Sequence, residues 1–235
     1  MDIQNSVAVV TGANRGLGRQ LAAELLKRGA TKVYAGARRP ESIDLPGVVP
    51  IQLDITDPAS IESAAKSAPD ATLLINNAGI STGVGLIEGD LADIRLEMET
   101  HFFGSLGVAR AFAPILTANG GGAILNVLSV LSWVHFPTVG GYSAAKAAEL
   151  AMTNVIRQEL APAGIDVTAL HVGYMDTDMA RNVSADKIDP ALVASLALDG
   201  IQSRALEVVA DDTSRNAKSA LSGPLHQLYP GLPTN

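Results

Sequence analysis

The residues in this chain best suited to acid–base chemistry are Tyr142 and Lys146, in the stretch YSAAK. In a helix, side chains four residues apart lie one turn from each other on the same face. A nearby ammonium favours the phenolate over the phenol, so it lowers the pKa of the tyrosine from about 10 toward neutrality. A tyrosine tuned in this way can give a proton to, or take one from, a carbonyl or alcohol oxygen. Because the spacing also occurs by chance in many helices, its meaning depends on the residues before it.

Two serines precede this pair. Ser129 follows a predicted strand, 13 residues before Tyr142, and its hydroxyl can hydrogen-bond a substrate oxygen and share the charge that develops there. Ser132 is a weaker candidate for the same role. A serine nucleophile of a hydrolase is the competing interpretation, but neither serine has the G-x-S-x-G surroundings of a nucleophile elbow. The sequence therefore favours an orienting serine over a hydrolase.

A glycine-rich turn, TGANRGLG from Thr11 to Gly18, lies between the first predicted strand and the first predicted helix. Gly12, Gly16 and Gly18 permit a tight turn and let backbone N–H groups approach a phosphate, which the N-terminus of the helix also attracts. The alternative is a glycine turn without a ligand, which this strand–turn–helix context disfavours. We therefore expect the turn to bind the pyrophosphate of a dinucleotide.

The end of the second predicted strand carries two arginines, Arg38 and Arg39, and no acid. In dinucleotide-binding folds this position meets the adenosine ribose, where an acid accepts from the 2′-hydroxyl of NAD and an arginine holds the 2′-phosphate of NADP. Guanidinium groups suit phosphate, and Arg15 lies nearby in the glycine turn. We expect NADP(H) in preference to NAD. The alternative, which applies most to Arg39, is a pair of solvated surface arginines.

Polar and small residues also end the third and fourth predicted strands. Asp54, followed by Ile55, is placed to accept a hydrogen bond from the adenine amino group, although a helix cap or turn explains this aspartate equally well. The stretch from Asn76 to Gly79 (NNAG) ends the fourth strand at the same edge of the sheet, where ligands of open α/β sheets bind. The small residues Ala78 and Gly79 would let a flat ring lie close. An ordinary Asn/Gly turn is the alternative.

The composition excludes several classes of function. Of the 235 residues, 47% are hydrophobic and 17% are charged, and the net charge is −7. This is typical of a globular protein with a sizeable core and not of a nucleic-acid binder. The chain has no cysteine, which excludes disulfides, cysteine nucleophiles and zinc–thiolate sites, and its histidines lack the spacing of a metal site. With no targeting segment and no apolar run near roughly 20 residues, we expect a soluble, cytoplasmic protein without a membrane partner.

Short apolar runs, which we expect to be strands, alternate with helical patterns along the chain. These elements must position the candidate site residues. Alternation at this spacing indicates right-handed crossovers and an α/β fold with a parallel sheet covered by helices on both faces. No linker interrupts the pattern, so we expect one domain over residues 1–235. The predicted strands are 6–11, 31–36, 48–53, 71–75, 123–128, 166–172 and 207–210. The predicted helices are 19–28, 58–68, 93–118 with a kink at Pro114, 141–160, 189–202 and 213–221, followed by an irregular tail over 222–235.

The glycine turn, the NNAG stretch, Ser129 and the Y-x-x-x-K pair stand in the order of the short-chain dehydrogenase/reductase family, which residues 5–180 resemble. The resemblance implies a doubly wound Rossmann fold of three layers, a seven-stranded parallel sheet and a nicotinamide cofactor. It implies that Tyr142 is the acid/base, that Lys146 lowers its pKa and holds the nicotinamide ribose, and that Ser129 orients the carbonyl. The residues that it assigns to the cofactor are Gly12, Asn14, Arg15, Gly16, Leu17 and Gly18 at the pyrophosphate and ribose, Asp54 and Ile55 at the adenine, and Asn76 and Ala78 at the adenosine ribose.

The chain departs from this family at two positions. Val172 replaces the proline of the P-G-x-x-x-T stretch after the sixth strand, whose threonine, Thr177 here, is a cofactor contact. His101 stands three residues before Gly104, where many members carry an asparagine that anchors a water between the lysine and solvent. A histidine can also donate, accept and relay a proton. His101 is therefore either a member of the proton relay or a satisfied core histidine.

These observations predict an NADP(H)-dependent carbonyl reductase that interconverts a ketone or aldehyde and an alcohol. The alternative is a non-catalytic dinucleotide-sensing or interaction protein on the same fold, which His101 supports best. The segments expected to form the substrate pocket are mostly apolar and indicate a hydrophobic substrate; they are 81–91, 131–137, which includes Trp133 and His135, and 174–193. Residues 178–190 could close as a lid. The family is usually dimeric or tetrameric, so we expect a homodimer or homotetramer.

Overall fold

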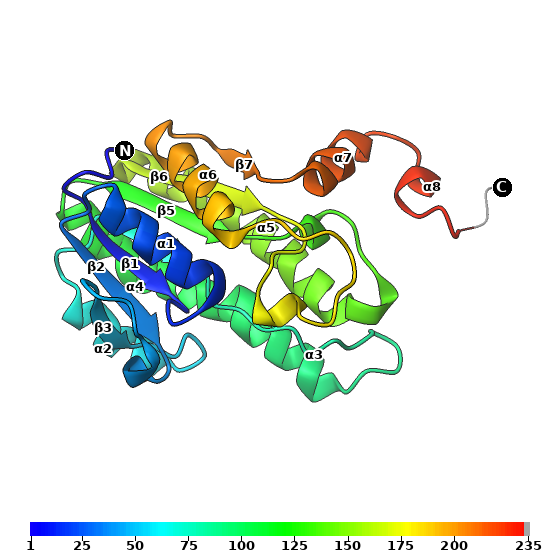
Figure 1. Ribbon diagram of the computed structural model, residues 1–235, viewed down its shortest axis with the longest axis horizontal. Coiled ribbons are helices and arrows are strands. Elements are labelled where there is room, and N and C mark those ends of the chain that lie inside the picture. Colours follow the sequence, from blue (N-terminus) through cyan, green and yellow to red (C-terminus); the bar gives the residue numbers. More distant parts are fainter. Residues whose placement is uncertain (233–235) are drawn as a thin grey trace.

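Seven parallel strands form one sheet at the centre of the protein. The structure is a computed structural model that describes residues 1–232, and within them the strand order is β3-β2-β1-β4-β5-β6-β7 (Figure 1). Each strand lies within two residues of its predicted range, because short β-branched and apolar runs buried on both faces are the usual signature of parallel strands. The strands are β1 (Val7–Thr11), β2 (Lys32–Ala37), β3 (Val49–Gln52), β4 (Leu73–Asn76), β5 (Gly122–Val127), β6 (Ile165–His171) and β7 (Glu207–Val209).

The helices alternate with the strands as predicted. They are α1 (Gly16–Lys27), α2 (Pro58–Ser67), α3 (Leu91–Met98), α4 (Ser105–Ala118), α5 (Gly140–Leu160), α6 (Pro190–Gln202), α7 (Asp212–Ala220) and the short α8 (Leu225–Leu228). Short 3-10 turns cover Pro40–Ser42, Val130–Ser132, Pro137–Val139, Ala161–Ala163 and Asp178–Ala180. The tail expected to be irregular over 222–235 contains α8, and its last residues, 233–235, lie outside the described part of the chain.

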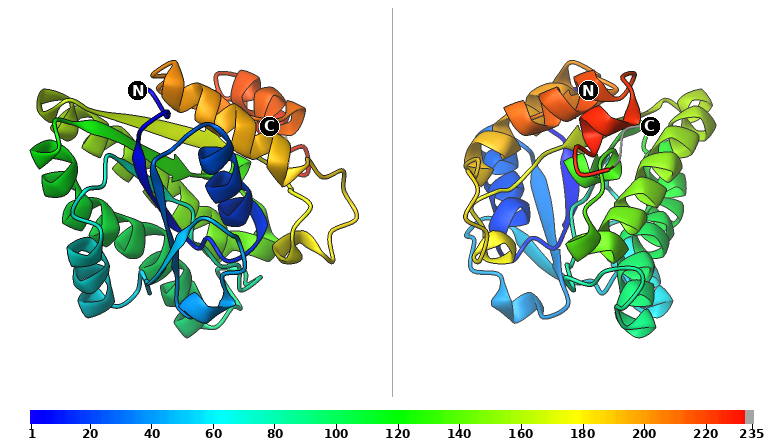
Figure 2. Two further views of the ribbon diagram at one scale, coloured as in Figure 1. Left: turned by 60° about the vertical axis from the view of Figure 1, so that its left-hand side comes forward. Right: turned by 90° about the vertical axis from the view of Figure 1, so that its right-hand side faces the viewer.

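Helices cover both faces of the sheet, so the molecule has three layers (Figures 1 and 2). On one face, Leu21 and Leu25 of α1 pack together with Leu198 of α6. On the other face, Phe112 of α4 packs with Ile156 of α5 in a second apolar core that also includes α2. The predicted α/β fold with a doubly wound parallel sheet is confirmed.

The strand order reverses next to β1. This strand pairs with β2 on one side and with β4 on the other, so the connections leave it in opposite directions. In open α/β sheets, such a point leaves a crevice outside the carboxyl ends of the strands, where ligands bind. The glycine turn that follows β1 and the NNAG stretch that follows β4 both lie at this crevice.

The long helix predicted over 93–118 is divided into three segments. Between α3 and α4, residues Glu99–Gly104 form a π-helical turn, while Pro114 lies inside α4. The expected irregularity is therefore at residues 99–104 and not at Pro114. A π-turn inserts an extra residue per turn and is frequent at functional sites. Here it contains His101, and Gly104 at its end lies so close to Ile55 that a Cβ atom would be 2.9 Å from the Ile55 carbonyl oxygen.

Candidate active site

Tyr142 and Lys146 lie on α5 as the sequence predicts, near the beginning of that helix. The Tyr142 side chain is half-buried and Lys146 is only 5% exposed. The Lys146 Nζ atom lies 5.8 Å from the centre of the Tyr142 ring and donates a hydrogen bond of 2.8 Å to the Val127 carbonyl oxygen at the end of β5. The lysine is therefore held between the catalytic face of α5 and the carboxyl end of the sheet.

Ser129 is buried directly after β5 and begins the 3-10 turn that follows. Its Oγ atom accepts a hydrogen bond of 3.1 Å from the Leu131 N–H. Ser132, the weaker candidate, has a different environment: its Oγ donates to the Ser129 carbonyl oxygen at 2.6 Å and lies 3.1 Å from Nδ1 of His171. Ser132 thus braces the turn, and Ser129 is the hydroxyl that interacts with Tyr142.

Opposing effects act on the Tyr142 phenol. Burial raises its pKa above the usual value, the Lys146 ammonium lowers it, and the buried Glu149 carboxylate raises it again. The net direction is upward. Without a ligand, Tyr142 is therefore a protonated phenol at neutral pH, which is the form that can donate a proton to a carbonyl oxygen.

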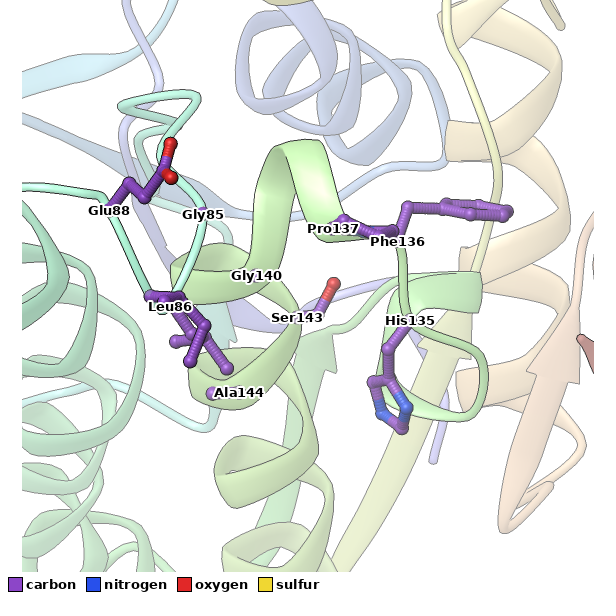
Figure 3. A pocket seen from close by; sticks show the side chains of 10 residues that line it. Gly85, Leu86, Glu88, His135, Phe136, Pro137, Gly140, Ser143 and Ala144 are labelled. Atoms are coloured by element: carbon purple, nitrogen blue, oxygen red, sulfur yellow. The ribbon is translucent and has the colours of Figure 1, made fainter. Parts of the chain in front are cut away.

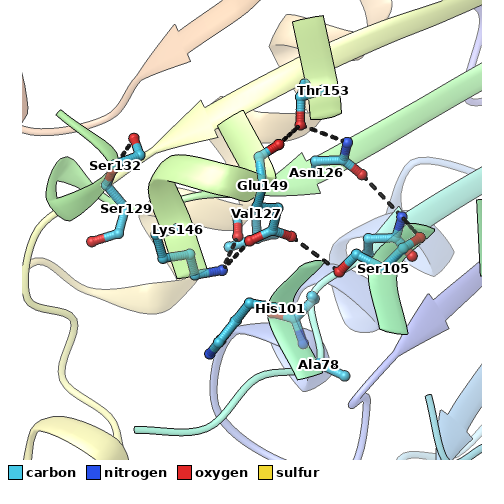
Figure 4. Close-up of polar contacts among 12 residues, drawn as sticks. Ala78, His101, Ser105, Asn126, Val127, Ser129, Ser132, Lys146, Glu149 and Thr153 are labelled. Carbon is cyan, nitrogen blue, oxygen red and sulfur yellow. Dashed lines mark hydrogen bonds and ion pairs between the residues drawn. The ribbon is translucent and has the colours of Figure 1, made fainter. Parts of the chain in front are cut away.

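Glu149 is the main site residue that the sequence analysis missed. It lies one turn after Lys146 on α5, is 1% exposed, and places Oε2 at 2.7 Å from Lys146 Nζ (Figure 4). Its Oε1 accepts a hydrogen bond of 3.0 Å from the Ser105 hydroxyl at the start of α4. The spacing of three residues was visible in the sequence, but only packing against α4 and β5 makes this pair buried.

A second buried network lies beside Glu149. The Asn126 side chain on β5 donates to the Thr153 hydroxyl at 2.9 Å and accepts from the Asn76 amide at 3.0 Å. The Asn76 amide also donates to the Ser105 carbonyl oxygen at 3.4 Å. The Asn76 side chain, which was expected at the adenosine ribose, therefore points into the interior, and only its backbone faces the crevice.

His101 is a buried imidazole that lies against Tyr142. It is 1% exposed, and its ring meets the Tyr142 ring edge-on with centroids 5.0 Å apart. Its Nε2 lies 2.8 Å from the Ile80 carbonyl oxygen. Because a carbonyl can only accept, the proton of the neutral ring is on Nε2. Burial and then the nearby Lys146 ammonium hold the pKa of His101 well below its usual value, so the ring is neutral at physiological pH.

The other ring nitrogen of His101, Nδ1, is an acceptor with no hydrogen-bond partner among residues 1–232. Buried polar atoms without partners are rare and call for an explanation, such as a water or a functional role. The ring also fills the space beside Gly79, where a Cβ atom would lie 2.7 Å from Cε1 of His101. The imidazole therefore occupies the space that a side chain at Gly79 would take.

The glycine turn has the backbone that phosphate binding requires. Gly12 and Gly16 have φ angles of +65° and +53°, and a Cβ at Gly18 would collide with the Gly12 carbonyl. The helix α1 begins after Arg15, and in the described chain no side chain caps its first turn. Helices α2, α3, α6 and α7, by contrast, each begin at an aspartate that accepts from a backbone N–H of the first turn.

An uncapped helix start with no acidic residue in its first turn leaves N–H groups and the positive end of the helix dipole for an anion. The residues of the turn therefore fit the pyrophosphate of a dinucleotide. Hydrogen bonds between Thr11 and the NNAG stretch hold the turn in place. The Thr11 hydroxyl accepts from the backbone N–H groups of Asn77 and Ala78, both at 2.9 Å, and the Asn77 amide donates to the Thr11 carbonyl oxygen at 2.9 Å.

The structure brings Thr177 and the turn together, since Gly16 faces the Thr177 side chain at van der Waals distance. Arg15 is mostly exposed and lies 3.5 Å from Asp178, in the segment expected to form a lid. Asn14 donates to the Ser42 hydroxyl at 3.2 Å, which connects the turn to the loop after β2. Arg38 and Arg39 lie in that loop with exposed side chains.

Several predicted cofactor residues have side chains turned into the core. Leu17 and Val172 belong to the apolar core under α1, and Ile55 belongs to the core on the opposite face. The Asp54 carboxylate accepts from the backbone N–H and the hydroxyl of Thr56, at 3.0 and 2.7 Å, so the turn explanation for this aspartate holds in the structure.

A cavity of about 660 Å³ opens beside the start of α5 (Figure 3). Its lining combines two of the expected pocket segments, through Gly85 to Glu88 and His135 to Pro137, with Gly140, Ser143 and Ala144 of the helix. Leu86 and Phe136 make it largely apolar. Ser129 and Tyr142 are outside this set of lining residues.

Trp133, which was expected to line the pocket, lies elsewhere. Its indole stacks on the buried His171 imidazole, with ring centroids 3.7 Å apart, and is also outside the lining of the cavity. The tail instead contributes to the site. Leu228 of α8 packs with Tyr142 around an apolar cluster formed by the loop after β5, and Tyr229 places its hydroxyl 2.8 Å from Nδ1 of His135.

Two further expectations concern metals and membranes. Nowhere in residues 1–232 do three or more His, Asp or Glu side chains gather as they would around a metal ion. None of the helices described combines the length and the apolar character needed to cross a bilayer.

Comparison with known proteins gives a consistent family relationship. The model of the short chain dehydrogenase family matches residues 6–188. A solved short chain dehydrogenase from Burkholderia cenocepacia J2315, in complex with NADP, is 42% identical, with a TM-score of 0.94 over 100% of both chains. The NADPH-dependent 1-acyldihydroxyacetone phosphate reductase of Schizosaccharomyces pombe is 33% identical over 185 residues, which are 75% of this chain and 62% of that protein.

A short chain dehydrogenase/reductase from Burkholderia phymatum, solved with NAD, has a TM-score of 0.85 over 100% of this chain and 99% of its own. Its identity of 23% shows a shared fold alone. The chain spans less than two thirds of the length of the first curated relatives.

Proposed function

The chain belongs to the short-chain dehydrogenase/reductase family, and from this we propose that it is an NADP(H)-dependent oxidoreductase that interconverts a ketone or aldehyde and an alcohol. The observation that carries the proposal is the juxtaposition of the Tyr142 phenol with the buried Lys146 ammonium and the Ser129 hydroxyl, beside an uncapped helix start. A protein that only binds a dinucleotide has no need of a tyrosine placed next to a buried ammonium.

In this proposal the chain's own residues hold the substrate oxygen and move its proton. Ser129 donates a hydrogen bond to the oxygen and orients it, and Tyr142 gives the proton in reduction or accepts it in oxidation. Lys146 stabilises the phenolate that remains after proton donation and holds the nicotinamide ribose. When bound, NADP(H) supplies or accepts the hydride, which is chemistry that belongs to the cofactor.

His101 is proposed to pass protons between Lys146 and solvent. Its ring lies against Tyr142, and its Nδ1 atom has no hydrogen-bond partner among residues 1–232. Nδ1 can therefore accept a hydrogen bond from a water or from a donor on the Lys146 side of the ring. Because burial keeps the ring neutral, it would act as a hydrogen-bonding link and not as a second acid.

Cofactor binding is proposed for the backbone of the glycine turn and of the strand ends. Gly12, Asn14, Arg15, Gly16, Leu17 and Gly18 would surround the pyrophosphate, with Asp54, Ile55, Asn76, Ala78, Gly79, Val172 and Thr177 along the rest of the crevice. The exposed Arg38 and Arg39, with no acid beside them, favour the 2′-phosphate of NADP over NAD. The related proteins solved with NADP or named as NADPH-dependent support the same preference.

The substrate is proposed to be hydrophobic, because the cavity beside α5 and the cluster around Tyr142 are mainly apolar. The segment 174–193, with the lid at 178–190, would close over it. We also propose a homodimer or homotetramer and a cytoplasmic location, which a chain without cysteines suits. The second hypothesis, a non-catalytic dinucleotide sensor, has the His101 substitution as its support.

One experiment separates these two functions. Binding of NADPH is measured as a shift of the melting temperature, and turnover is measured as NADPH consumption with a panel of hydrophobic ketones and aldehydes. The enzyme hypothesis predicts a shift together with turnover of at least one compound. A shift without turnover across the panel favours the sensor, and the lack of a shift at high NADPH concentration removes the cofactor from both hypotheses.

A further inference from the structure

Glu149 is a buried carboxylate that the proposed mechanism leaves without a role. It lies on the same face of α5 as Lys146, and both of its oxygens are held, one by the lysine at 2.7 Å and the other by Ser105 at 3.0 Å (Figure 4). Burial raises the pKa of Glu149, because removing a carboxylate from water is unfavourable. The Lys146 ammonium and the Ser105 hydroxyl act against that rise and favour the carboxylate form.

We propose that Glu149 is a positioning residue for Lys146. Its carboxylate anchors the ammonium between α5, α4 and the end of β5, and it sets the pH at which the coupled Tyr142–Lys146 pair loses its first proton. The catalytic meaning of this role rests on the proposed function, whereas the electrostatic claim concerns the protein without cofactor or substrate.

The contacts of Lys146 show why an anchor is needed. The lysine is 5% exposed, and its Nζ has two acceptors, the Val127 carbonyl oxygen and Glu149. Burial lowers the pKa of Lys146, and the adjacent Glu149 carboxylate together with Tyr142 returns it above the ordinary value. Glu149 and Tyr142 thus both counter the effect of burial on the lysine, and Glu149 has the larger effect.

The same carboxylate acts on Tyr142 in the opposite sense to the lysine. From the phenol, the Lys146–Glu149 pair is nearly neutral, so the ammonium lowers the pKa of the tyrosine less than it would alone. Without the negative charge of Glu149, the coupled Tyr142–Lys146 pair releases a proton more easily. The first proton of the pair then leaves at a lower pH.

The other ionisable groups around the pair do not replace Glu149. Glu97 reaches the site from α3, but its Oε1 accepts from the backbone N–H and the hydroxyl of Thr82 at 2.6 and 2.7 Å, and its Oε2 lies 3.7 Å from Nε2 of His101. It acts on the Tyr142–Lys146 pair in the same sense as Glu149 but less strongly. His101 faces the site from the π-turn and His171 from β6, and burial lowers the pKa of both imidazoles, that of His171 to about 4. Both rings are therefore uncharged where the phenol titrates.

The test is a titration of the Tyr142 phenol by ultraviolet absorbance of the phenolate, in the protein without cofactor. The signal of Tyr142 is isolated as the difference between each protein and the same protein with Tyr142→Phe. In Glu149→Gln, which keeps the shape of the side chain and removes its charge, the phenolate is expected to form at a pH lower by about one unit. The pH profile of kcat/KM should move in the same direction.

Two further variants make the result specific. Glu159→Gln makes the same chemical change at an exposed position of α5 and should titrate like the parent protein. Glu149→Asp keeps the charge but places it farther from Lys146 Nζ. The Tyr142 phenol of this variant should therefore titrate at a pH between those of the parent and Glu149→Gln. If Glu149→Gln does not fold, the change in the pH at which the Tyr142 phenol titrates in Glu149→Asp, relative to the parent, tests the proposal by itself.

A phenol that titrates at the same pH in Glu149→Gln or Glu149→Asp as in the parent overturns the proposal, and so does a move to higher pH. This readout needs neither NADPH nor a substrate. A protein that shows the shift but no turnover with any carbonyl compound would refute the oxidoreductase function while it supports the role of Glu149.

Discussion

The indole of Trp133 stacks on the imidazole of His171, with ring centroids 3.7 Å apart and ring planes within 13° of parallel. This contact joins the loop that carries Ser129 to the end of β6. Nδ1 of His171 lies 3.1 Å from the Ser132 hydroxyl, which in turn donates to the Ser129 carbonyl oxygen. The buried His171 imidazole is therefore linked through Ser132 to the turn that carries Ser129.

His171 should make the protein less stable in acid. Burial lowers its pKa from 6.5 to about 4 in the folded state, so between these values the unfolded chain binds a proton that the folded chain does not. Stability is therefore complete above about pH 6.5 and declines as the pH falls toward 4, by roughly 3 kcal/mol for this group at about 1.36 kcal/mol per pH unit.

Urea unfolding at pH 7.5 and pH 4.5 measures this effect. His171→Gln should be less stable at pH 7.5 but should lose less stability on acidification than the parent protein. His226→Gln, which changes an exposed histidine of α8, is the matched control and should behave like the parent. An equal loss in His171→Gln and the parent would show that another group causes the acid sensitivity.

Replacing Tyr142 by phenylalanine should remove turnover and preserve cofactor binding. The variant keeps the ring against His101 but has no proton to give, so kcat should fall by at least roughly 100-fold. The melting-temperature shift with NADPH should remain near that of the parent. Tyr34→Phe makes the same change on β2, where the hydroxyl donates to Asp70, and should retain turnover. Retained turnover in Tyr142→Phe would exclude the tyrosine from the mechanism.

Arg38→Asp should change the preference between the two cofactors. An acid at this position repels a 2′-phosphate and accepts from a 2′-hydroxyl. The ratio of kcat/KM with NADPH to that with NADH should fall by roughly tenfold or more, as expected for the loss of a charge-assisted hydrogen bond. Arg110→Asp, at an exposed position of α4, should leave the ratio unchanged. If the ratio is the same in Arg38→Asp and the parent, the arginine does not recognise the phosphate.

His101 variants test the proposed proton link. His101→Asn supplies an amide where the imidazole was and should keep turnover within several-fold of the parent. His101→Leu fills the space next to Gly79 without a polar atom and should lower kcat by roughly 100-fold, at the low end of what positioned proton transfer contributes. Melting temperatures identify any general loss of folding. Equal kcat in His101→Leu and His101→Asn would make His101 a packing residue.

Much of this protein could be predicted from residue types and their spacing. The strands are short apolar runs, and four of the helices, α2, α3, α6 and α7, begin at an aspartate cap, so these elements follow from local chemistry. The glycine turn and the Tyr142–Lys146 pair are equally local, because a positive φ needs glycine and a helix brings residues four apart to one face. Both were found without any tertiary contact.

Tertiary packing alone decided which polar groups face the site. Asn76 turns inward because Asn126 and the Ser105 backbone lie within reach across β5 and α4. Trp133 lies outside the predicted pocket because its indole stacks on the His171 imidazole at the end of β6. Leu228 of the tail packs on the same apolar cluster of Val130, Leu131 and Val134 as Tyr142 does, although the sequence of the tail gives no sign of that contact.

The Lys146–Glu149 pair likewise depends partly on local sequence and partly on tertiary packing. Its spacing of three residues on α5 is a property of the sequence, and on an exposed helix face it would be worth only a few tenths of a kcal/mol. Burial by α4 and β5 removes the water that would screen the two charges, so the same pair governs the proton equilibrium of the site. Residue order determined that the two side chains are neighbours, and the packing of distant segments determined how strongly their charges act.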